Sequence, residues 1–388
     1  MSDRPVLVHL TTTDMSLDWL LRPQLEAFVD AGYDVVGMSA PGPHVEALEA
    51  SGIRHHPIES LTRSMAPGRD ALAMWELYRA FRSLKPTIVH THNPKPGVFG
   101  RLAAKAAGVP VIVNTVHGLY ALPEDRVAKK AVVYGLERIA ATCSDAELLQ
   151  NPEDLPVLRR LGIPHERLTV LGNGIDLRRF DPDTTTDARE RIRRELGVGD
   201  RTTVIGVVGR LVWEKGYREV FEAAARMQDE DCVFVVVGPA EPDKAGAVDA
   251  EAIAAAERTG VRFLGERRDM TDLYAAFDIY TLASYREGFP RSAMEAAAMG
   301  LPVVASDIRG CRQVVADGET GALFPARDAA ALTKALTRLV VDRPLRVRQG
   351  VAARIRAMDH FDDRDVIATT LRAYDQALGA VPALVTAS

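Results

Sequence analysis

Short apolar runs alternate with helical patterns along almost the whole chain of 388 residues. The clearest of the predicted strands are residues 6–10, 34–39, 87–92, 111–116, 203–209, 233–237, 278–283 and 303–306. Strands separated by helices at this spacing form parallel sheets through right-handed βαβ units, with helices on both faces. The sequence therefore predicts an α/β fold built from doubly wound parallel sheets.

The alternation is interrupted once, near the middle of the chain. Asn173-Gly-Ile-Asp176 has turn chemistry, and residues 178–186 are polar without periodicity. A length of 388 residues suits two domains of about 180 residues each. We expect two Rossmann-like domains facing a cleft, with the N-terminal domain at residues 1–180 and the C-terminal domain at residues 181–361.

The composition excludes several classes of protein. Apolar residues make up 47% of the chain and charged residues 26%, so two sizeable cores are expected. A net charge of −5 argues against nucleic-acid binding. The three cysteines lie far apart without zinc spacing, and no apolar run approaches the ~20 residues of a membrane helix. With no secretory signal either, we expect a cytoplasmic protein, at most peripheral at the inner face of the membrane.

The stretch from Tyr285 to Pro302 is the most informative part of the sequence. It follows the predicted strand 278–283, and Pro290 is expected to be the first residue of a helix that ends at Gly300. Glu287 then lies in the strand-to-helix turn and Glu295 on the helix. Free backbone N–H groups and the helix dipole attract phosphate to such a turn, whereas carboxylates accept hydrogen bonds from hydroxyl groups. A diphosphate with a sugar on one side and a ribose on the other would satisfy both features.

A second stretch, Gly209-Arg-Leu-Val-Trp-Glu-Lys-Gly216, follows the predicted strand 203–209. It presents Arg210 and Lys215 just before a helix expected from Tyr217. Arginine offers a planar fork to phosphate oxygens, and lysine offers a point charge that can reach a second phosphate. The alternative is that both cations are simply solvated at the surface.

These two stretches resemble the donor site of family 4 glycosyltransferases, which are retaining enzymes with the GT-B fold. The resemblance rests on the Glu287–Glu295 spacing, on Arg286-Glu-Gly-Phe-Pro290 and on Gly209-Arg210 with Lys215-Gly216. It implies that the two cations hold the leaving diphosphate, that Glu287 positions the donor sugar and that Glu295 holds the ribose. The other implied donor-binding residues are Gly209, Gly288, Phe289 and Pro290.

The resemblance carries two further expectations. Because the two cations can stabilise a departing diphosphate, no metal and no other cofactor is expected. Asp181-Pro-Asp183 formally matches a metal-binding Asp-x-Asp, but a turn is the better explanation in a linker. The C-terminal helix, near residues 362–380, is expected to cross back and pack on the first domain.

In the first domain, Thr115-Val-His-Gly-Leu-Tyr120 resembles the family's loop that faces the donor sugar, which places His117 at the reaction centre. The alternative is a strand-end histidine bonded to backbone. His90 and His92 are expected on opposite sides of their strand, with one of them in the core. Residues 11–16 lack the glycine that many family members carry there, and Asp14 or Ser16 would serve equally well as a helix N-cap.

Cations outnumber acidic residues between residues 82 and 138. Glu124, Asp125 and Glu137 oppose a larger basic set: Arg82, Lys85, Lys95, Arg101, Lys105, Arg126, Lys129, Lys130 and Arg138. A basic side of this kind suits an anionic membrane surface or a lipid-diphosphate acceptor. Ordinary solvated helix faces explain the same residues as well.

His92-Asn-Pro-Lys-Pro-Gly97 and Asn173-Gly-Ile-Asp176 look closest to the branch of the family that extends capsule, O-antigen and other lipid-linked glycans. The implied reaction moves a sugar from a nucleotide-diphosphate sugar, with uridine favoured, to a hydroxyl of a lipid-linked glycan. The leaving phosphate can itself take the acceptor proton, and the anomeric configuration is retained.

Three alternatives remain open. A UDP-sugar 2-epimerase shares the fold, although the first-domain loops offer no pair of carboxylates to act at C2 of the sugar. A transferase acting on a soluble acceptor would carry the same motifs. A sugar-nucleotide sensor without catalysis is disfavoured, because both glutamates and both cations are intact.

Overall fold

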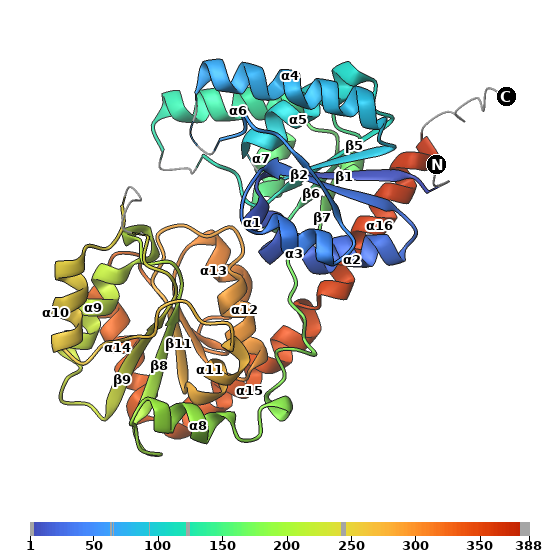
Figure 1. Ribbon diagram of the computed structural model, residues 1–388. Helices are drawn as coiled ribbons and strands as arrows, with labels where there is room; N and C mark the ends of the chain where they lie inside the picture. The colour runs from blue at the N-terminus through green and yellow to red at the C-terminus, as the bar shows by residue number, and fades with distance from the viewer. Residues whose placement is uncertain are drawn as a thin grey trace. The chain divides into compact units, whose positions relative to one another are not determined.

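The computed structural model describes residues 4–62, 64, 66–92, 94–121, 125–241 and 246–380. The chain divides into two compact units (Figure 1). Unit 1 comprises Met1–Gly172 and the chain from Arg364 onward, and unit 2 comprises Asn173–Asp363. The boundaries thus lie at residues 172 and 363, against the expected 180 and 361. Asn93 and Glu124, named above, lie outside the described residues.

Unit 1 is built on a seven-stranded parallel sheet with the strand order β3-β2-β1-β4-β5-β6-β7. Its strands are β1 Val6–Thr13, β2 Asp34–Ala40, β3 Arg54–Pro57, β4 Ile88–His92, β5 Val111–Val116, β6 Ala146–Leu149 and β7 Leu168–Val170. Its helices are α1 Asp14–Ser16, α2 Arg22–Asp30, α3 Val45–Ala50, α4 Pro67–Leu84, α5 Pro94–Ala107, α6 Val127–Ala141, α7 Leu155–Arg160 and α16 Asp363–Ala380.

Helices cover both faces of this sheet because its strands carry apolar side chains on both sides. On one face, Leu77 of α4 and Ala104 of α5 pack with Val8 and Val89. On the other, Phe28 of α2 and Tyr374 of α16 pack with Leu7 and Ile88. The C-terminal helix therefore completes the core of unit 1.

Unit 2 is built on a six-stranded parallel sheet with the order β10-β9-β8-β11-β12-β13. Its strands are β8 Thr203–Val208, β9 Cys232–Val237, β10 Arg262–Phe263, β11 Ile279–Leu282, β12 Val303–Ser306 and β13 Gly321–Phe324. Its helices are α8 Ala188–Glu195, α9 Tyr217–Arg226, α10 Ala250–Arg258, α11 Met270–Ala276, α12 Arg291–Ala298, α13 Arg309–Val314, α14 Ala329–Val341 and α15 Arg343–His360. Both sheets are Rossmann-like.

Each sheet has a topological switch point, where the order of strands reverses direction. In unit 1 it lies between β1 and β4, and in unit 2 between β8 and β11. Ligands of doubly wound sheets bind outside the carboxyl ends of the strands at such points. The loops that follow β8 and β11 are the two stretches that the sequence analysis singled out.

Three local features were not predicted in this form from the sequence. The chain just before α2 is a π-helical segment, Leu17–Leu21. Helix α8 follows the expected linker, in a stretch for which no element was predicted; Ile192 gives it a buried contact and Arg193 forms an ion pair with Asp278 at 3.0 Å. Pro290 is the N-cap of α12, so the helix begins at Arg291, one residue later than expected.

Candidate active site

The loop after β8 is held close to the end of β11 by a glycine. Gly216 has φ 76°, and a Cβ built on it would lie 2.0 Å from the carbonyl oxygen of Ala283. A larger residue cannot be accommodated without moving one of the two loops. The turn Trp213–Lys215 therefore lies directly against the end of the neighbouring strand.

This approach brings Lys215 and Glu287 together. Lys215 Nζ lies 2.6 Å from Glu287 Oε1, and the Ser284 hydroxyl donates to the same oxygen at 2.6 Å. The two side chains of the ion pair remain partly accessible, with exposed fractions of 24% and 13%. Both hydrogen bonds end on Oε1, so Oε2 can accept a hydrogen bond from a ligand hydroxyl.

Arg210 extends from the same loop toward the residues that follow β9. Its Nη1 lies 3.0 Å from Glu241 Oε2, and the pair is well exposed. Ion pairs of this kind contribute little to stability, because water already solvates both partners. An anionic ligand with two phosphates would compete with Glu241 and Glu287 for the two cations.

Glu295 lies on the first two turns of α12 and is oriented by a tyrosine that the sequence analysis missed. The buried Tyr274 hydroxyl donates to Glu295 Oε2 at 3.0 Å. Burial raises the pKa of Glu295, while the charge of Arg291 opposes that shift. The apolar periodicity of residues 270–276 makes Tyr274 look like an ordinary core residue of a helix. Its position in the helix before β11 is the one sequence signal that could have pointed to it.

The turn that contains Gly288, Phe289 and Pro290 is supported from behind. Asn173 Nδ2 donates to the Phe289 carbonyl oxygen at 3.1 Å, and the Phe289 ring meets Phe361 edge-on at 5.9 Å. Gly310 allows α13 to approach, since a Cβ there would lie 2.5 Å from the Glu287 carbonyl oxygen. Asn173 thus positions this turn, a role that its sequence motif did not reveal.

Asp181 and Asp183, the formal Asp-x-Asp, form a turn. Asp181 Oδ1 accepts from the backbone N–H of Asp183 at 3.1 Å and from Arg354 at 2.9 Å. This arrangement uses the carboxylate to cap a short 3-10 helix and to hold α15.

In unit 1, His117 follows β5 and is hydrogen-bonded to a second histidine. Its Nε2 lies 3.0 Å from His92 Nδ1. The expectation that His90 and His92 lie on opposite sides of β4 was wrong, because residues two apart in a strand point to the same face. Their rings stack at 4.3 Å, and both are buried.

Burial lowers the pKa of every histidine in this group. The pKa of His117 falls to about 4, although a hydrogen bond with the Gln150 side chain opposes the shift, and that of His9 falls to about 3. The pKa values of His90 and His92 lie well below the usual range. All four imidazoles are therefore neutral at pH 7.

The loop at residues 11–16 is fixed by Asp14 rather than by a glycine. The Asp14 carboxylate accepts from the backbone N–H of His44 at 2.7 Å. Gly42 makes room for it, since a Cβ on Gly42 would lie 2.3 Å from Asp14 Oδ2. Thr13 holds the N-cap position of α1 and Ser16 that of the π-helical segment Leu17–Leu21, but neither side chain makes a capping hydrogen bond; Asp14, the first residue of α1, is not a cap.

The basic side expected between residues 82 and 138 is smaller than the sequence suggested. Lys95 is buried and lies 2.5 Å from Asp70. Arg101 is fully buried between Glu137 and Glu147, at 2.7 and 2.6 Å, and these carboxylates raise its pKa. These two cations serve the core, whereas Arg82, Lys85, Lys105, Arg126 and Arg138 are exposed.

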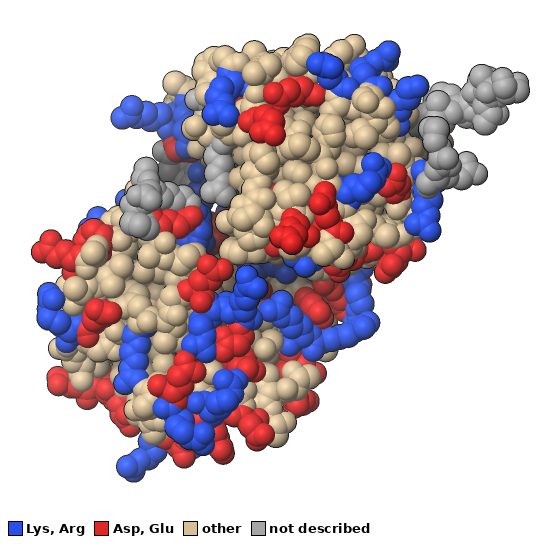
Figure 2. All heavy atoms as spheres, viewed as in Figure 1, with Lys and Arg blue, Asp and Glu red and all other residues tan. Residues whose placement is uncertain are grey.

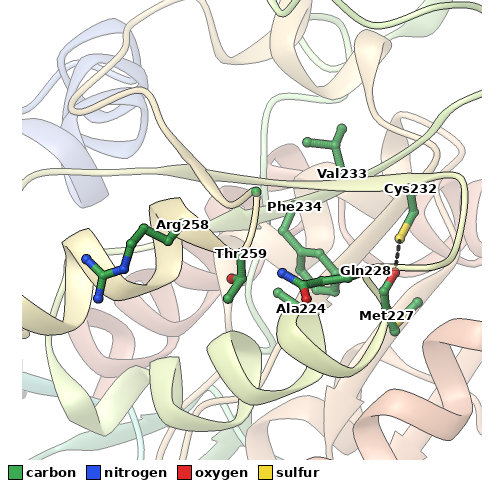
Figure 3. A pocket seen from close by; sticks show the side chains of 9 residues that line it. Ala224, Met227, Gln228, Cys232, Val233, Phe234, Arg258 and Thr259 are labelled. Carbon is green, nitrogen blue, oxygen red and sulfur yellow. Dashed lines mark hydrogen bonds between the residues drawn. The ribbon is translucent and has the colours of Figure 1, made fainter.

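A cavity of 330 Å³ lies elsewhere in unit 2 (Figure 3). Its lining includes Met227 at the end of α9, Cys232 at the start of β9, and Arg258 and Thr259 at the end of α10. It therefore opens at the amino-terminal edge of the sheet, opposite the loops that follow β8 and β11. This position separates it from the candidate site.

Known proteins share both units. A model described as glycosyl transferases group 1 matches residues 188–356, and one described as glycosyltransferase family 4 matches residues 24–179. The chain is 31% identical over 312 residues to a protein of Escherichia coli, UDP-Gal:alpha-D-GlcNAc-diphosphoundecaprenol alpha-1,3-galactosyltransferase, covering 79% of each chain. It is also 31% identical over 362 residues to a D-inositol 3-phosphate glycosyltransferase of Salinispora arenicola, covering 88% of this chain and 79% of that one.

Among solved structures, HepE of Anabaena in complex with UDP and glucose aligns with a TM-score of 0.80 at 19% identity, covering 96% of this chain and all of that one. This likeness agrees with the GT-B fold expected from the sequence. Family models match both halves of the chain, and the E. coli relative is 31% identical over 79% of its length. The chain belongs to glycosyltransferase family 4 and is a glycosyltransferase.

Proposed function

We propose that the protein transfers a sugar from a UDP-sugar to a hydroxyl group of a lipid-diphosphate-linked glycan, with retention of configuration and without a metal ion. The observation that carries this proposal is the contact between Lys215 and Glu287 at the switch point of unit 2. It places a cation for the leaving phosphate beside a carboxylate that can hold sugar hydroxyls. A donor site needs these two groups side by side.

The proposed roles follow from the chemistry of each group. Arg210 and Lys215 stabilise the negative charge that grows on the diphosphate as the glycosidic bond breaks. Glu287 accepts from hydroxyls of the donor sugar, and Glu295 from the ribose. The leaving phosphate takes the acceptor proton, so no protein nucleophile is required. His117, neutral at pH 7, lines the reaction centre as a hydrogen-bonding group.

Two relatives bear on the donor and the acceptor. The E. coli protein is named for UDP-galactose and a diphosphoundecaprenol acceptor, which favours a uridine donor and a lipid-linked glycan. The Salinispora protein is named for D-inositol 3-phosphate, which keeps a soluble phosphorylated acceptor as the second candidate. The epimerase alternative gains no support, since both relatives are transferases.

Titration of UDP, GDP and ADP into the protein, with and without magnesium, tests the donor site. We expect UDP to bind at least about ten-fold more tightly than the other two, equivalent to about 1.4 kcal/mol. Its affinity should change little with magnesium, because Arg210 and Lys215 supply the positive charge. A dependence on magnesium greater than ten-fold, or no binding of any nucleotide, would contradict the proposal.

Product analysis tests the rest of the proposed reaction. Incubation with the preferred UDP-sugar and a short lipid-diphosphate-linked glycan should give a product whose anomeric proton coupling matches that of the donor. An inverted product would refute retention. Faster transfer to inositol phosphate than to the lipid-linked glycan would establish the second candidate, and formation of an epimer without an acceptor would establish the epimerase.

We further propose that helices α4 and α6 of unit 1 contact an anionic membrane. Only Ala140 and Ala141 of α6 are buried. Large apolar side chains are exposed on both helices: Leu72, Met74, Trp75, Tyr78, Val127, Val132, Leu136 and Ile139. Exposed cations accompany them, including Arg79, whose guanidinium lies 4.7 Å from the Trp75 ring centre.

Apolar side chains beside cations are the combination that binds a bilayer surface peripherally. Along the upper edge of Figure 2, where Figure 1 places α4, Lys and Arg side chains stand among uncharged ones. None of the described helices is long and apolar enough to cross a membrane. The protein would then bind a lipid-linked acceptor at the membrane surface, where the diphosphate of the acceptor lies.

The double variant Leu72→Ser, Trp75→Ser should weaken binding to phosphatidylglycerol vesicles by about ten-fold or more, since each large apolar side chain is worth about 1.5–3 kcal/mol when buried. Co-sedimentation measures the effect. Val347→Ser, at an equally exposed apolar position of α15 in unit 2, is the matched control and should bind as the wild type does. If vesicle binding weakens equally in the double variant and in Val347→Ser, or weakens in neither, the proposed membrane-binding surface is refuted.

A further inference from the structure

Beneath the carboxyl edge of the unit 1 sheet, a chain of hydrogen bonds connects the C-terminal helix to His117. Thr115 Oγ1 lies 2.7 Å from His90 Nε2, and His90 Nδ1 lies 2.6 Å from the Tyr374 hydroxyl. The Tyr374 hydroxyl lies 3.2 Å from His9 Nε2, and His9 Nδ1 lies 2.9 Å from His92 Nε2. His92 Nδ1 then meets His117 Nε2 at 3.0 Å.

All the hydrogen bonds of this chain must run in the same direction, because each of its side chains has only one proton to donate. A neutral imidazole has one N–H and one bare nitrogen, so each ring must donate at one end and accept at the other. Each histidine in the chain uses both nitrogens, apart from His117, whose Nε2 alone is engaged in it. The Tyr374 hydroxyl has one proton and two lone pairs, but it is buried and these two ring nitrogens are its partners in the described part of the protein, so when it accepts from one histidine it must donate to the other. Fixing the direction of the hydrogen bond at Thr115 therefore fixes the tautomer of every ring.

The Thr115 end of the chain selects the direction. Thr115 is buried, and its hydroxyl makes one hydrogen bond within the described part of the protein, to His90. If that hydroxyl accepted from His90, its own proton would be buried without an acceptor, which is costly. Thr115 therefore donates, and the donation passes through His90, Tyr374, His9 and His92 in turn.

We propose that this chain holds His117 in the tautomer that carries its proton on Nδ1. With Nε2 accepting from His92, the other ring nitrogen is a fixed donor, available to the Gln150 side chain or to a ligand oxygen. Tyr374 and Thr115 are then positioning residues, which act on His117 from a distance. This inference rests on the proposed function only in its kinetic consequence, because a donating His117 can bind a sugar or phosphate oxygen but cannot act as a base.

The same residues invite a different interpretation, as a metal site. Nitrogen atoms of His9, His90 and His92 lie within 4.8 Å of one another. A metal requires bare nitrogens that converge on one point. Here the nitrogens of these rings pair with one another, with Tyr374 or with Thr115 at ordinary hydrogen-bond distances, which favours the proton chain.

Nitrogen-15 NMR of the imidazoles decides between these alternatives, because protonated and bare ring nitrogens have well-separated shifts. In the wild type, His117 should show a protonated Nδ1 and a bare Nε2, with its signals assigned by their loss in His117→Gln. In Thr115→Val, which removes the terminal donor but keeps the shape, the His117 signals should shift toward the Nε2–H form. Thr115→Ser restores the hydroxyl and should restore the wild-type spectrum.

Tyr374→Phe breaks the chain at its middle and should produce the same shift as Thr115→Val. The matched control is Tyr33→Phe, since Tyr33 packs against Tyr374 with ring centres 6.1 Å apart but lies outside the chain. It should leave the His117 tautomer unchanged. A His117 that is protonated on Nε2 in the wild type, or that does not respond to Thr115→Val and Tyr374→Phe, would overturn the proposal. Stoichiometric zinc binding that is lost in His9→Gln would overturn it in favour of a metal site.

A kinetic arm separates this inference from the proposed function. Thr115→Val should lower kcat by about ten-fold, the value of one lost hydrogen bond of roughly 1.4 kcal/mol. The affinity for UDP should stay unchanged, because the diphosphate cations lie in unit 2, and Thr115→Ser should recover the rate. If no sugar transfer is found in any protein, the proposed function fails while the NMR result still decides the tautomer.

Discussion

Replacing Lys215 with alanine is expected to reduce kcat by a factor of about 10²–10³, the usual loss when one stabiliser of a developing negative charge is removed from an active site. Lys215 is the cation that lies 2.6 Å from Glu287, so it is the group closest to both the sugar and the leaving phosphate in the proposed arrangement. The measurement is sugar transfer to the lipid-linked glycan at saturating donor. Arg210→Ala should reduce the affinity for UDP as well, because the exposed guanidinium of Arg210 is proposed to bind the terminal phosphate of UDP.

The control for this prediction is Lys334→Ala, which removes an exposed lysine from α14 and should leave kcat within about two-fold of the wild type. The free energy of unfolding should change by less than about 1 kcal/mol in Lys215→Ala and in Lys334→Ala. Lys215 loses only a partly exposed ion pair, which contributes little to stability, and Lys334 is an exposed side chain. A Lys215→Ala enzyme that retains full activity would rule out the proposed clamp. A folded Lys215→Ala protein that has lost activity supports it.

The second large effect is expected on stability. Glu147 is fully buried and accepts hydrogen bonds from Arg101 at 2.6 Å and from Asn114 at 2.7 Å. Glu147→Ala leaves the buried guanidinium of Arg101 without this partner, so the free energy of unfolding of unit 1 should fall by about 3–5 kcal/mol. Urea denaturation followed by circular dichroism measures this change.

A compensating variant shows whether Glu147→Ala loses stability because a buried charge is left unpaired or because a cavity is created. Arg101→Met combined with Glu147→Leu and Glu137→Gln removes all three charges of the network and should recover much of the lost stability, since well-packed uncharged side chains often equal a buried ion pair. Glu222→Ala, which breaks an exposed pair with Arg226 on α9, should cost less than about 0.5 kcal/mol. If Glu147→Ala were equally mild, the buried network would have no stabilising role.

The sequence predicted the two sheets well because the strands are apolar runs whose neighbours are amphipathic helices. It missed α8, since that helix buries few apolar residues and depends on the ion pair between Arg193 and Asp278. A pattern of hydrophobicity cannot show a contact of this kind. The first turn of α12 was placed one residue too early for a similar reason, since Pro290 fits either an N-cap or the first helical position.

In the candidate site, residue type and spacing identified Glu287, Glu295, Arg210 and Lys215, and the structure brings Lys215 against Glu287. The supports of these residues could not be predicted. Tyr274 and Asn173 act through single hydrogen bonds from elements distant in sequence. The basic side was overestimated for the converse reason, because a count of charges cannot show that Lys95 and Arg101 are buried with carboxylates.

The return of the C-terminal helix to unit 1 has a consequence for biosynthesis. Unit 2 is a continuous segment, whereas the core of unit 1 includes Tyr374, which the ribosome adds only after all of unit 2. Domains usually fold in the order in which they emerge. Here unit 2 can complete its fold first. Until Tyr374 has been synthesised, unit 1 lacks part of its core, and His9 and His90 lack their hydrogen bonds to the Tyr374 hydroxyl. A stalled or truncated chain would therefore release a folded unit 2 attached to an unfinished unit 1.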